Sequence, residues 1–351
     1  MTRIGRAAVM TGKRFEVREY PVPEPQPGSL LLRQELSGIC GTDLHNWEFQ
    51  RLEGDIILGH ENVGIVDALG PGVETDSLDR PIKEGDRIVF APGTNQGAYG
   101  FLPAEEEPYL RGGFGEYIYL WHPKTIFLKT DLPTEVAVLT EPSACAVHCV
   151  TRAKIQFGDT VVVQGSGPIG LLVLNWARLS GAGRVISVGG PRGRLEMAEK
   201  FGADLTINIA DVPDPEERKR IVRENTPQNL GADVVFECAG NPAAIVEGLD
   251  YLRHSGTYVE YGHFVDSGTF ECNPNQMLLR KNLRLEAAWG FETQHFLRSL
   301  RMLEKHADLF DDFVSHTIPL DRVSEGINAL HRGYHLDGKD AIKIAVKADM
   351  G

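Results

Sequence analysis

Short apolar runs interrupted by glycine and proline make up the first third of the chain. The run Leu30–Leu36 follows a segment at 20–28 that carries four prolines and cannot form a helix. Further β-prone runs lie at 64–70, 85–93 and 112–121, with glycine or proline within or beside each of them. Runs of this length are typical of strands joined by turns. The pattern therefore predicts a compact, mostly β domain up to about residue 128.

Between about 150 and 289 the pattern changes to apolar runs that alternate with helical periodicity. Strands are predicted at 160–164, 184–190, 232–240 and 256–262, and helices from Pro168 and over 193–202. Such alternation is typical of a parallel sheet with right-handed crossover helices. The predicted fold class is therefore α/β, with a doubly wound parallel-sheet domain following a mostly β domain.

The last sixty or so residues return to a different pattern. Helices are predicted over 291–306 and Ser324–His331, and a final strand over 341–346. We expect this segment to rejoin the first domain. The predicted domains are then residues 1–150 with 291–351, and residues 151–290.

A glycine-rich turn joins the first strand of the second domain to its first helix. Gly165, Gly167 and Gly170 form a GxGxxG motif with Pro168 and Ile169 between the last two. In such a motif the first glycine permits a tight turn, the second lets the backbone approach a pyrophosphate, and the third lets the helix pack against the sheet. A glycine cluster can arise by chance in a turn, but the strand, turn and helix context favours a dinucleotide site.

The end of the next strand bears on the choice between NAD and NADP. An acidic residue about 20 positions after the motif holds the ribose 2′-hydroxyl of NAD in many such domains. Here Gly189 and Gly190 take that place, and Arg192 and Arg194 follow. An arginine can pair with a 2′-phosphate, so we favour NADP. The arginines also fit a solvated helix start, and a glycine there also fits relaxed use of NAD.

Size and charge narrow the function classes. The chain has 351 residues, 42% hydrophobic and 24% charged, which suits a soluble globular protein with more than one core. Its formal net charge of -13 disfavours nucleic acid and anionic membrane surfaces as partners. No apolar run has the length of a membrane span and the start lacks a signal peptide pattern, so we expect a cytoplasmic protein.

Thiol, imidazole and carboxyl groups occur at positions suited to a metal. The five cysteines show no disulfide framework spacing, and Cys40 is followed 20 residues later by His60 and Glu61. Glu141 begins a later helical run. Together these are ligand types that zinc prefers. Each residue alone also fits a purely structural role, as a buried free cysteine, a core histidine with satisfied hydrogen bonds, or a turn glutamate paired to an arginine.

The motifs CGTDLH, GHENVG, GDRI, EPSACAVHC and GSGPIG, in this order, identify a family resemblance. The sequence resembles the zinc-dependent medium-chain dehydrogenases/reductases of the alcohol dehydrogenase superfamily, particularly the sorbitol and threonine dehydrogenase-like branch. The resemblance extends from Arg6 to Val346. It implies a GroES-like catalytic domain, a Rossmann domain, and hydride transfer between a nicotinamide cofactor and a small alcohol or polyol, or the corresponding ketone.

The resemblance also implies roles for single residues. Cys40 and His60 are the expected zinc ligands, and Glu61 and Glu141 look like carboxylates that alternate with water as further ligands. Thr42 resembles the hydroxyl that accepts the alcohol proton. His45 resembles the group that relays this proton through the cofactor ribose to solvent. A capping hydroxyl and a partly exposed loop histidine are the structural alternatives for these two.

Two further expectations concern metal content and assembly. Relatives carry four closely spaced cysteines in a structural-zinc lobe, but residues 93–113 contain none. We therefore expect one zinc per subunit. Relatives form dimers or tetramers through the edge strand of the cofactor sheet, here 284–290, so a homodimer or homotetramer is expected.

Two other functions remain open from the sequence. A zinc-independent quinone or enoyl reductase shares this fold, but it does not need Cys40, Glu61 and Glu141 together. A non-catalytic cofactor-binding protein is the second alternative. Loss of activity on zinc removal, and turnover of alcohols or ketones, separate the zinc dehydrogenase from both.

Overall fold

The computed structural model describes residues 3–94 and 96–348, and it divides into two units. Unit 1 comprises Met1–Glu141 and Leu300–Gly351, and unit 2 comprises Pro142–Ser299. Both division points lie inside helices, α3 (Thr140–Ala153) and α8 (Thr293–Lys305). The limits expected from the sequence, at 150/151 and 290/291, differ because helical periodicity continues across a division point that falls within a helix.

A mixed sheet, mainly antiparallel, forms the framework of unit 1. Its strand order is β10–β6–β5–β3–β20–β17, and β9 also pairs with β3. The strands are β3 (Leu30–Gly38), β5 (Glu61–Leu69), β6 (Arg87–Phe90), β9 (Tyr117–Leu120), β10 (Phe127–Lys129), β17 (Val314–Pro319) and β20 (Lys343–Lys347). The C-terminal strand β20 therefore lies directly beside β3 from the start of the chain.

A smaller sheet and three helices complete the core of unit 1. The sheet has the order β2–β1–β4. These elements are β1 (Ile4–Thr11), β2 (Arg14–Pro21), β4 (Ile56–Ile57), α1 (Gly41–Phe49), α2 (Thr134–Ala137) and α9 (Val323–His331). Apolar side chains of β1 and α9, including Val9 and Ile327, are fully buried in one cluster. This packing fixes α1, which contacts α9, just after the end of β3.

The described residues of 93–113 form a loop that contains one short pair of strands. Strands β7 (Gly93–Thr94) and β8 (Gly97–Ala98) pair, and β18 (His335–Leu336) and β19 (Lys339–Asp340) form a separate ribbon elsewhere in unit 1. The guanidinium of Arg111 donates to the carbonyl oxygens of Pro103 and Glu106 at 2.9 and 3.1 Å. Hydrogen bonds and packing thus hold this loop in the described chain.

Unit 2 is built on a six-stranded parallel sheet. The strand order is β13–β12–β11–β14–β15–β16, so the direction of winding reverses between β11 and β14. The strands are β11 (Thr160–Gln164), β12 (Arg184–Gly189), β13 (Leu205–Asn208), β14 (Ala232–Glu237), β15 (Leu252–Glu260) and β16 (Arg284–Ala287). In such a sheet, ligands bind outside the carboxyl ends of the strands at the point of reversal.

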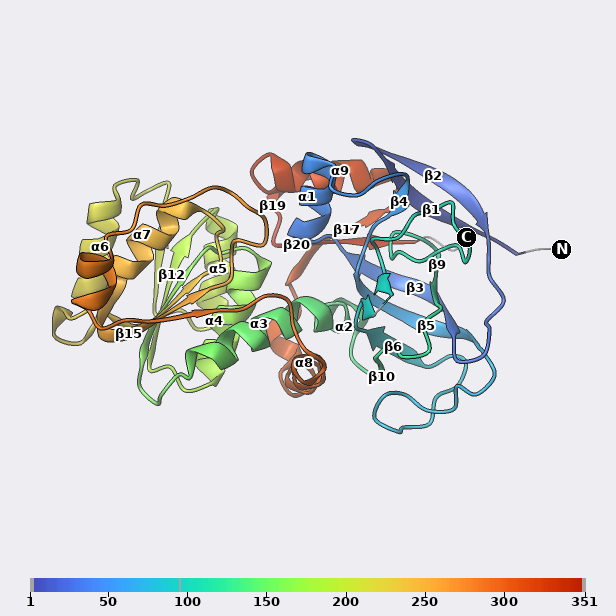
Figure 1. The fold of residues 1–351 in the computed structure, drawn as a ribbon, viewed down its shortest axis with the longest axis horizontal. Helices are drawn as coiled ribbons and strands as arrows, with labels where there is room; N and C mark the ends of the chain where they lie inside the picture. The colour runs from blue at the N-terminus through green and yellow to red at the C-terminus, as the bar shows by residue number, and fades with distance from the viewer. Residues whose placement is uncertain (1–2, 95, 349–351) are drawn as a thin grey trace. The chain divides into compact units, whose positions relative to one another are not determined.

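Helices cover both faces of this sheet, as Figure 1 shows. Helices α4 (Pro168–Leu179) and α5 (Arg192–Lys200) lie on one face, and α6 (Pro215–Glu224) and α7 (Pro242–Tyr251) lie on the other. Val162, Val235 and Leu249 belong to the buried cluster on the α6 and α7 side. The strands predicted from apolar runs and the helix opened by Pro168 are present, and the polar segment that begins at Asp211 contains α6.

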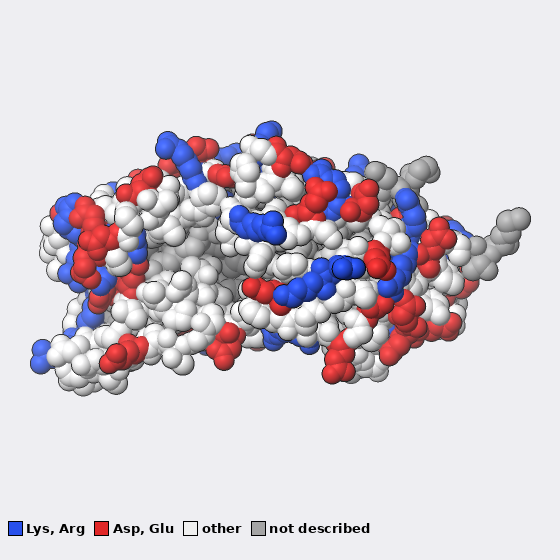
Figure 2. Space-filling model, turned by 90° about the horizontal axis from the view of Figure 1, so that it is seen from above, with Lys and Arg blue, Asp and Glu red and all other residues white. Residues whose placement is uncertain are grey.

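Charged side chains of both signs lie interspersed over the face drawn in Figure 2. Many of them form local pairs, such as Arg220 with Glu217 and Glu224 on α6. Exposed pairs of this kind contribute little to stability. Among the described residues, none of the helices combines the length and the apolar character that crossing a bilayer requires.

Candidate active site

Three of the predicted metal ligands converge in unit 1. Cys40 caps the N-terminus of α1, His60 directly precedes β5, and Glu61 is the first residue of β5. One ligand atom from each lies within 4.8 Å of the other two. His60 and Glu61 are 5% and 1% exposed. The strand end at β3 and the strand start at β5 therefore bring together residues that are 20 positions apart in sequence.

Gly38 makes room for this cluster. It is the register partner of Glu61 across β3 and β5. A Cβ atom at Gly38 would lie 2.0 Å from Oε2 of Glu61, a separation that no side chain can occupy. A glycine at the end of β3 is therefore required for the Glu61 carboxylate to point into the cluster.

Asp43 links the helix start to the histidine ligand. Its Oδ2 accepts the backbone N–H of Cys40 at 2.9 Å, as in a capping box. Its Oδ1 lies 3.4 Å from Nδ1 of His60. Fully buried, this carboxylate both caps α1 and faces the imidazole. Carboxylates behind a ligand histidine fix the orientation and tautomer of its ring.

Lys343, which sequence reasoning missed, is the positive charge of the cluster. Its ammonium group pairs with Oε2 of Glu61 and donates to the carbonyl oxygen of Ile39 at 3.0 Å. Burial lowers the pKa of Lys343, but the charges of Glu61 and Cys40 outweigh burial and leave the pKa raised. The one available signal was a lysine inside the apolar run at 341–346.

Glu141 adds a further carboxyl group to the surroundings of His60 and Glu61. It lies at the start of α3 and is 8% exposed. Burial raises the pKa of Glu141 to about 7; His60 opposes this shift and the charge of Glu61 adds to it. Crowded, buried carboxylates of this kind favour a bound cation, which offsets their mutual repulsion.

The donor set fits a zinc ion on the chemistry of the residues themselves. It combines thiol, imidazole and carboxyl groups, which are the ligand types of zinc sites. Oε1 of Glu61 is buried and has no hydrogen-bond partner among the described residues, although a buried oxygen of this kind normally has one. Burial lowers the pKa of His60, but Asp43 and Cys40 outweigh it. The cluster as a whole is thus short of positive charge.

Thr42 and His45 lie on α1 next to the cysteine. The Sγ of Cys40 lies 3.6 Å from Oγ1 of Thr42. His45 follows one turn later, where its ring stacks on Phe49 with centroids 5.9 Å apart. Burial lowers the pKa of His45, and Nδ1 of its ring has no hydrogen-bond partner among the described residues. The helix therefore presents a hydroxyl and a neutral imidazole on neighbouring turns.

Three large aromatic side chains, Trp47, Phe49 and Trp289, have different surroundings. Trp47 packs against the core of unit 1 and donates from its indole N–H to the carbonyl oxygen of Lys13 at 3.0 Å. Phe49 is exposed and stacks on His45. Trp289 is exposed in unit 2 and stacks on Phe264 with centroids 4.6 Å apart. Trp47 is therefore a packing residue.

The GxGxxG motif joins β11 to α4 in unit 2. Gly165 has a φ of +90°, and a Cβ there would lie 2.7 Å from the backbone of Cys238. A Cβ at Gly170 would lie 1.8 Å from the carbonyl oxygen of Gly165. Gly167 caps α4, with Pro168 and Ile169 in its first turn. The turn and the close helix approach thus need glycine at both ends of the motif.

The residues after β12 lie around this turn. Gly189 is buried, and a Cβ there would lie 2.4 Å from Oγ of Ser166. That hydroxyl also accepts the backbone N–H of Gly190 at 2.8 Å. The Nη1 atom of Arg194 lies 3.9 Å from the Cβ position of Gly167, whereas the side chain of Arg192 is 82% exposed. The two arginines therefore have different access to a ligand at this turn.

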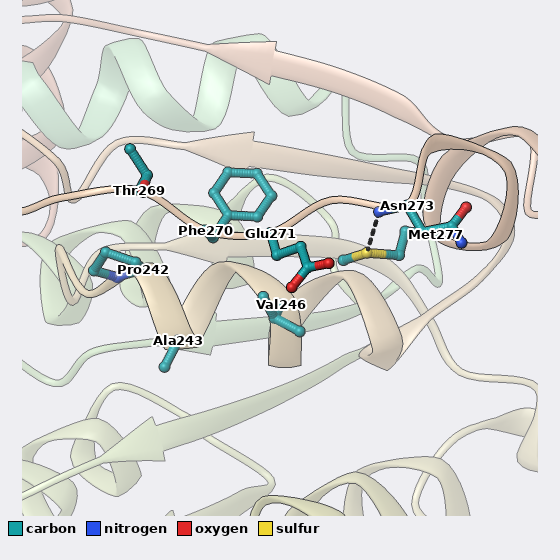
Figure 3. Close-up of a pocket in the computed structure, with 8 residues that line it drawn as sticks. All are labelled: Pro242, Ala243, Val246, Thr269, Phe270, Glu271, Asn273 and Met277. Carbon is teal, nitrogen blue, oxygen red and sulfur yellow. Dashed lines mark hydrogen bonds between the residues drawn. The ribbon is translucent and has the colours of Figure 1, made fainter.

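A separate pocket of about 500 Å³ lies in unit 2, beside α7 (Figure 3). Pro242, Ala243 and Val246 of α7 line it together with Phe270 and Glu271 of the segment that passes over this helix. The residues that line it, which also include Thr269, Asn273 and Met277, contain none of the predicted site residues. Its lining is largely apolar and supplies no set of convergent polar groups.

Family models match most of the chain. The model described as alcohol dehydrogenase GroES-like domain matches residues 26–131, and the model described as zinc-binding dehydrogenase matches residues 168–305. The chain belongs to the zinc-binding dehydrogenase family. The resemblance and the α/β fold class inferred from the sequence are thereby confirmed, and the chain is an NAD(P)-linked zinc alcohol dehydrogenase of the medium-chain type.

Individual relatives agree with this family. The 5-exo-hydroxycamphor dehydrogenase of Pseudomonas putida is 32% identical over 93% of this chain and 96% of its own length. The erythritol/L-threitol dehydrogenase of Mycolicibacterium smegmatis is 30% identical over 95% of this chain and 94% of its own. The crystal structure of a putative zinc-binding dehydrogenase from Sinorhizobium meliloti bound to NADP superposes with a TM-score of 0.83, at 26% identity over 98% of this chain and 99% of that one.

The variant Lys343→Met tests the charge balance of the dehydrogenase site. It leaves the buried Glu61 carboxylate without its positive partner, so we expect the free energy of unfolding of chelated protein to fall by about 3 kcal/mol in urea titrations. Added Zn²⁺ restores part of this loss because the cation replaces the missing charge.

The matched control is Lys347→Met, at the exposed end of the same strand. We expect its free energy of unfolding to stay within about 0.5 kcal/mol of the wild type. Equal stability of the two variants would show that the Lys343 pair does not hold the cluster together.

Proposed function

We propose that this dehydrogenase interconverts a small secondary alcohol or polyol with the corresponding ketone. The observation that carries the proposal is the convergence of Cys40, His60 and Glu61 within 4.8 Å in a buried position. Two of its relatives are named for a hydroxycamphor and for erythritol or L-threitol, which are hydroxyl-bearing substrates. The shared chemistry is a hydroxyl carbon that loses a hydride.

Cys40 and His60 would hold the zinc ion, with Glu61 or Glu141 supplying carboxylate. When bound there, zinc acts as a Lewis acid toward the substrate oxygen. Lys343 pairs with one oxygen of Glu61 and donates to the carbonyl oxygen of Ile39, and this pair keeps the carboxylate oriented whether or not it contacts the ion. The absence of cysteine from residues 93–113 supports one catalytic zinc ion and no structural zinc ion in unit 1.

Thr42 and His45 would move the proton that leaves the alcohol. Oγ1 of Thr42 lies 3.6 Å from Sγ of Cys40, so a substrate hydroxyl next to the thiol can donate to it. The lowered pKa of His45 keeps its imidazole neutral near pH 7, so the ring can accept a proton and release it to solvent. Asp43 holds the start of α1, and with it the backbone on which both groups are carried.

The N-terminus of α4 would bind the pyrophosphate of the dinucleotide. Helix N-termini attract phosphate through unpaired N–H groups and the helix dipole. Gly167 caps α4, and apart from its chain neighbours the guanidinium of Arg194 is the one described group within 4 Å of its Cβ position. The nicotinamide nucleotide, when bound, supplies the carbon that exchanges the hydride.

NADP is the preferred form in this proposal. Gly189 and Gly190 end β12 without a carboxylate, and a structural neighbour was crystallised with NADP. Arg192 is the more accessible of the two candidate arginines, since its side chain is 82% exposed and its pairing with Glu196 spans 3.5 Å. It would bind the 2′-phosphate, whereas Arg194 beside Gly167 would contact the part common to both nucleotides.

A homodimer or homotetramer is part of the same proposal. Strand β16 pairs with β15 on one side, and its outer edge has no strand partner among the described residues. Leu279, Leu285 and Trp289, on and around β16, are 73%, 52% and 65% exposed. An open strand edge beside exposed apolar side chains is a surface that a second copy of the same sheet can cover.

The test of the catalytic proposal combines zinc removal with the variant Thr42→Val. Chelated wild-type protein should lose NADPH-dependent reduction of small ketones and regain it on addition of Zn²⁺. Thr42→Val should lower kcat about 100-fold because the proton acceptor is gone, with unchanged zinc content. Thr151→Val, an exposed change on α3, is the matched control and should retain full kcat. Full activity of chelated protein would overturn the proposal.

The cofactor preference is tested with Arg192→Gln. We expect the Kd for NADPH, measured by nucleotide fluorescence, to rise about 10-fold or more through loss of a charge-assisted hydrogen bond. The Kd for NADH should not change. Arg220→Gln on the exposed face of α6 is the control for loss of a surface charge. Equal effects on both nucleotides, or none, would contradict a role of Arg192 in 2′-phosphate binding.

Assembly is tested with Leu285→Lys. Light scattering on the wild type should give a mass of at least twice the 38.7 kDa chain. The lysine places a charge at the strand edge and should yield monomers. Leu230→Lys, at a 60% exposed position in the loop before β14, should leave the mass unchanged. A monomeric wild type would refute the assembly proposal.

A further inference from the structure

A row of polar residues ends three neighbouring strands of the unit 2 sheet. Gln164 of β11 is the register partner of Glu237 of β14, which is in turn the partner of Glu260 of β15. Register partners in a parallel sheet project to the same face. Two residues earlier, Val162 and Val235 belong to the apolar cluster under α6 and α7. The polar row therefore borders that core at the carboxyl ends of the strands.

His263 joins two of these carboxyl groups. Its Nδ1 lies 2.8 Å from Oε1 of Glu260 and 3.4 Å from Oε2 of Glu237. The other oxygen of Glu237 accepts the backbone N–H groups of Ala239 and Gly240 at 2.7 and 2.9 Å. One oxygen of Glu237 is thus fixed by the loop after β14, and the second is directed towards His263.

Several buried polar atoms at this place have no hydrogen-bond partner among the described residues. They are Oε2 of Glu237, Oε2 of Glu260, Nε2 of His263, Oε1 of Gln164 and the hydroxyl of Tyr258. Glu237 is 0% exposed and Gln164 and Tyr258 are each 3% exposed, so bulk water does not reach them. Leaving such buried atoms without a partner is unfavourable. Their concentration at one point indicates a ligand that these residues share.

We propose that Glu237, Glu260 and His263 bind a divalent metal ion, with Zn²⁺ as the representative ion. One donor atom from each residue lies within 4.8 Å of the other two. Two ligands on a tetrahedral zinc at about 2.1 Å are separated by about 3.4 Å, which matches the separation of His263 Nδ1 and Glu237 Oε2. Two carboxylates and one neutral imidazole also balance the charge of a divalent ion.

The surroundings favour a small cation over a larger ligand. Glu237 is fully buried, so the aromatic ring of a cofactor cannot reach its second oxygen, whereas a single ion can. The backbone donors on Oε1 then serve as the outer hydrogen bonds that orient a metal ligand.

The donor set differs from the proposed zinc ligands of unit 1. All three residues belong to unit 2, whereas Cys40, His60 and Glu61 belong to unit 1, and the set contains no thiol. Glu237 ends β14, which borders the reversal point of the sheet, and Glu260 ends β15 beside it. An ion there would tie the loop after β14 to the loop after β15.

Metal content of the full chain tests the site. Protein is loaded with Zn²⁺, dialysed against metal-free buffer and measured by mass spectrometry of the metal. We expect the wild type to hold about two zinc ions per chain, and the variant Cys40→Ser/His60→Ala to retain about one. Glu260→Gln should also retain about one, the ion on which dehydrogenase activity depends. Glu271→Gln removes an exposed carboxylate of unit 2 and should retain both ions.

Absorption spectra of bound Co²⁺ distinguish the unit 2 site from the unit 1 site. This test does not require the Glu260→Gln variant to fold. Co²⁺ in Cys40→Ser/His60→Ala should show d–d absorption without a thiolate charge-transfer band, because the unit 2 site has only nitrogen and oxygen donors. His263→Gln on this background should abolish that absorption. A Cys40→Ser/His60→Ala protein that binds no metal would overturn the inference while leaving the proposed function intact. Retention of both zinc ions by Glu260→Gln would overturn it as well.

Discussion

The buried charge balance around Glu61 is the constraint on which unit 1 depends. A thiol, an imidazole and two carboxyl groups lie in a place that water reaches poorly, and burying such groups is costly unless opposite charge is supplied. Lys343 supplies it from the last strand of the chain, next to β3. The C-terminal segment therefore completes the site electrostatically as well as completing the sheet.

The same constraint explains local details of sequence in unit 1. Gly38 lacks a side chain because Glu61 Oε2 fills that space. Asp43 is placed so that one oxygen caps α1 while the other faces His60. The loop that contains Phe101 adds to the site, since the ring centroid of Phe101 lies 5.0 Å from that of His60. This contact packs the histidine on its loop side.

Unit 2 handles buried polarity in a different way. Its sheet has an apolar interior, and polar side chains appear where the parallel strands end. At the reversal point the glycines of the GxGxxG turn bring backbone against backbone, which leaves N–H groups for phosphate. Beyond it, Glu237, Glu260 and His263 gather polar atoms that the fold itself does not satisfy. Glycine-rich backbone and polar side chains of unit 2 are therefore gathered at the carboxyl ends of the central strands β11, β14 and β15.

Local signals in the sequence were sufficient to predict most helices and strands of unit 2 and to single out several site residues. The apolar periods located β11, β12, β14 and α4, and Cys40, His60 and the glycine motif stand out because their chemistry and spacing are local properties. Lys343 and the Glu237, Glu260 and His263 set did not stand out. Their meaning depends on strand register, which pairs residues that are distant in sequence. Sequence thus determined which groups are available, whereas only tertiary structure decided which buried charges face one another, because that choice is made by sheet pairing and burial.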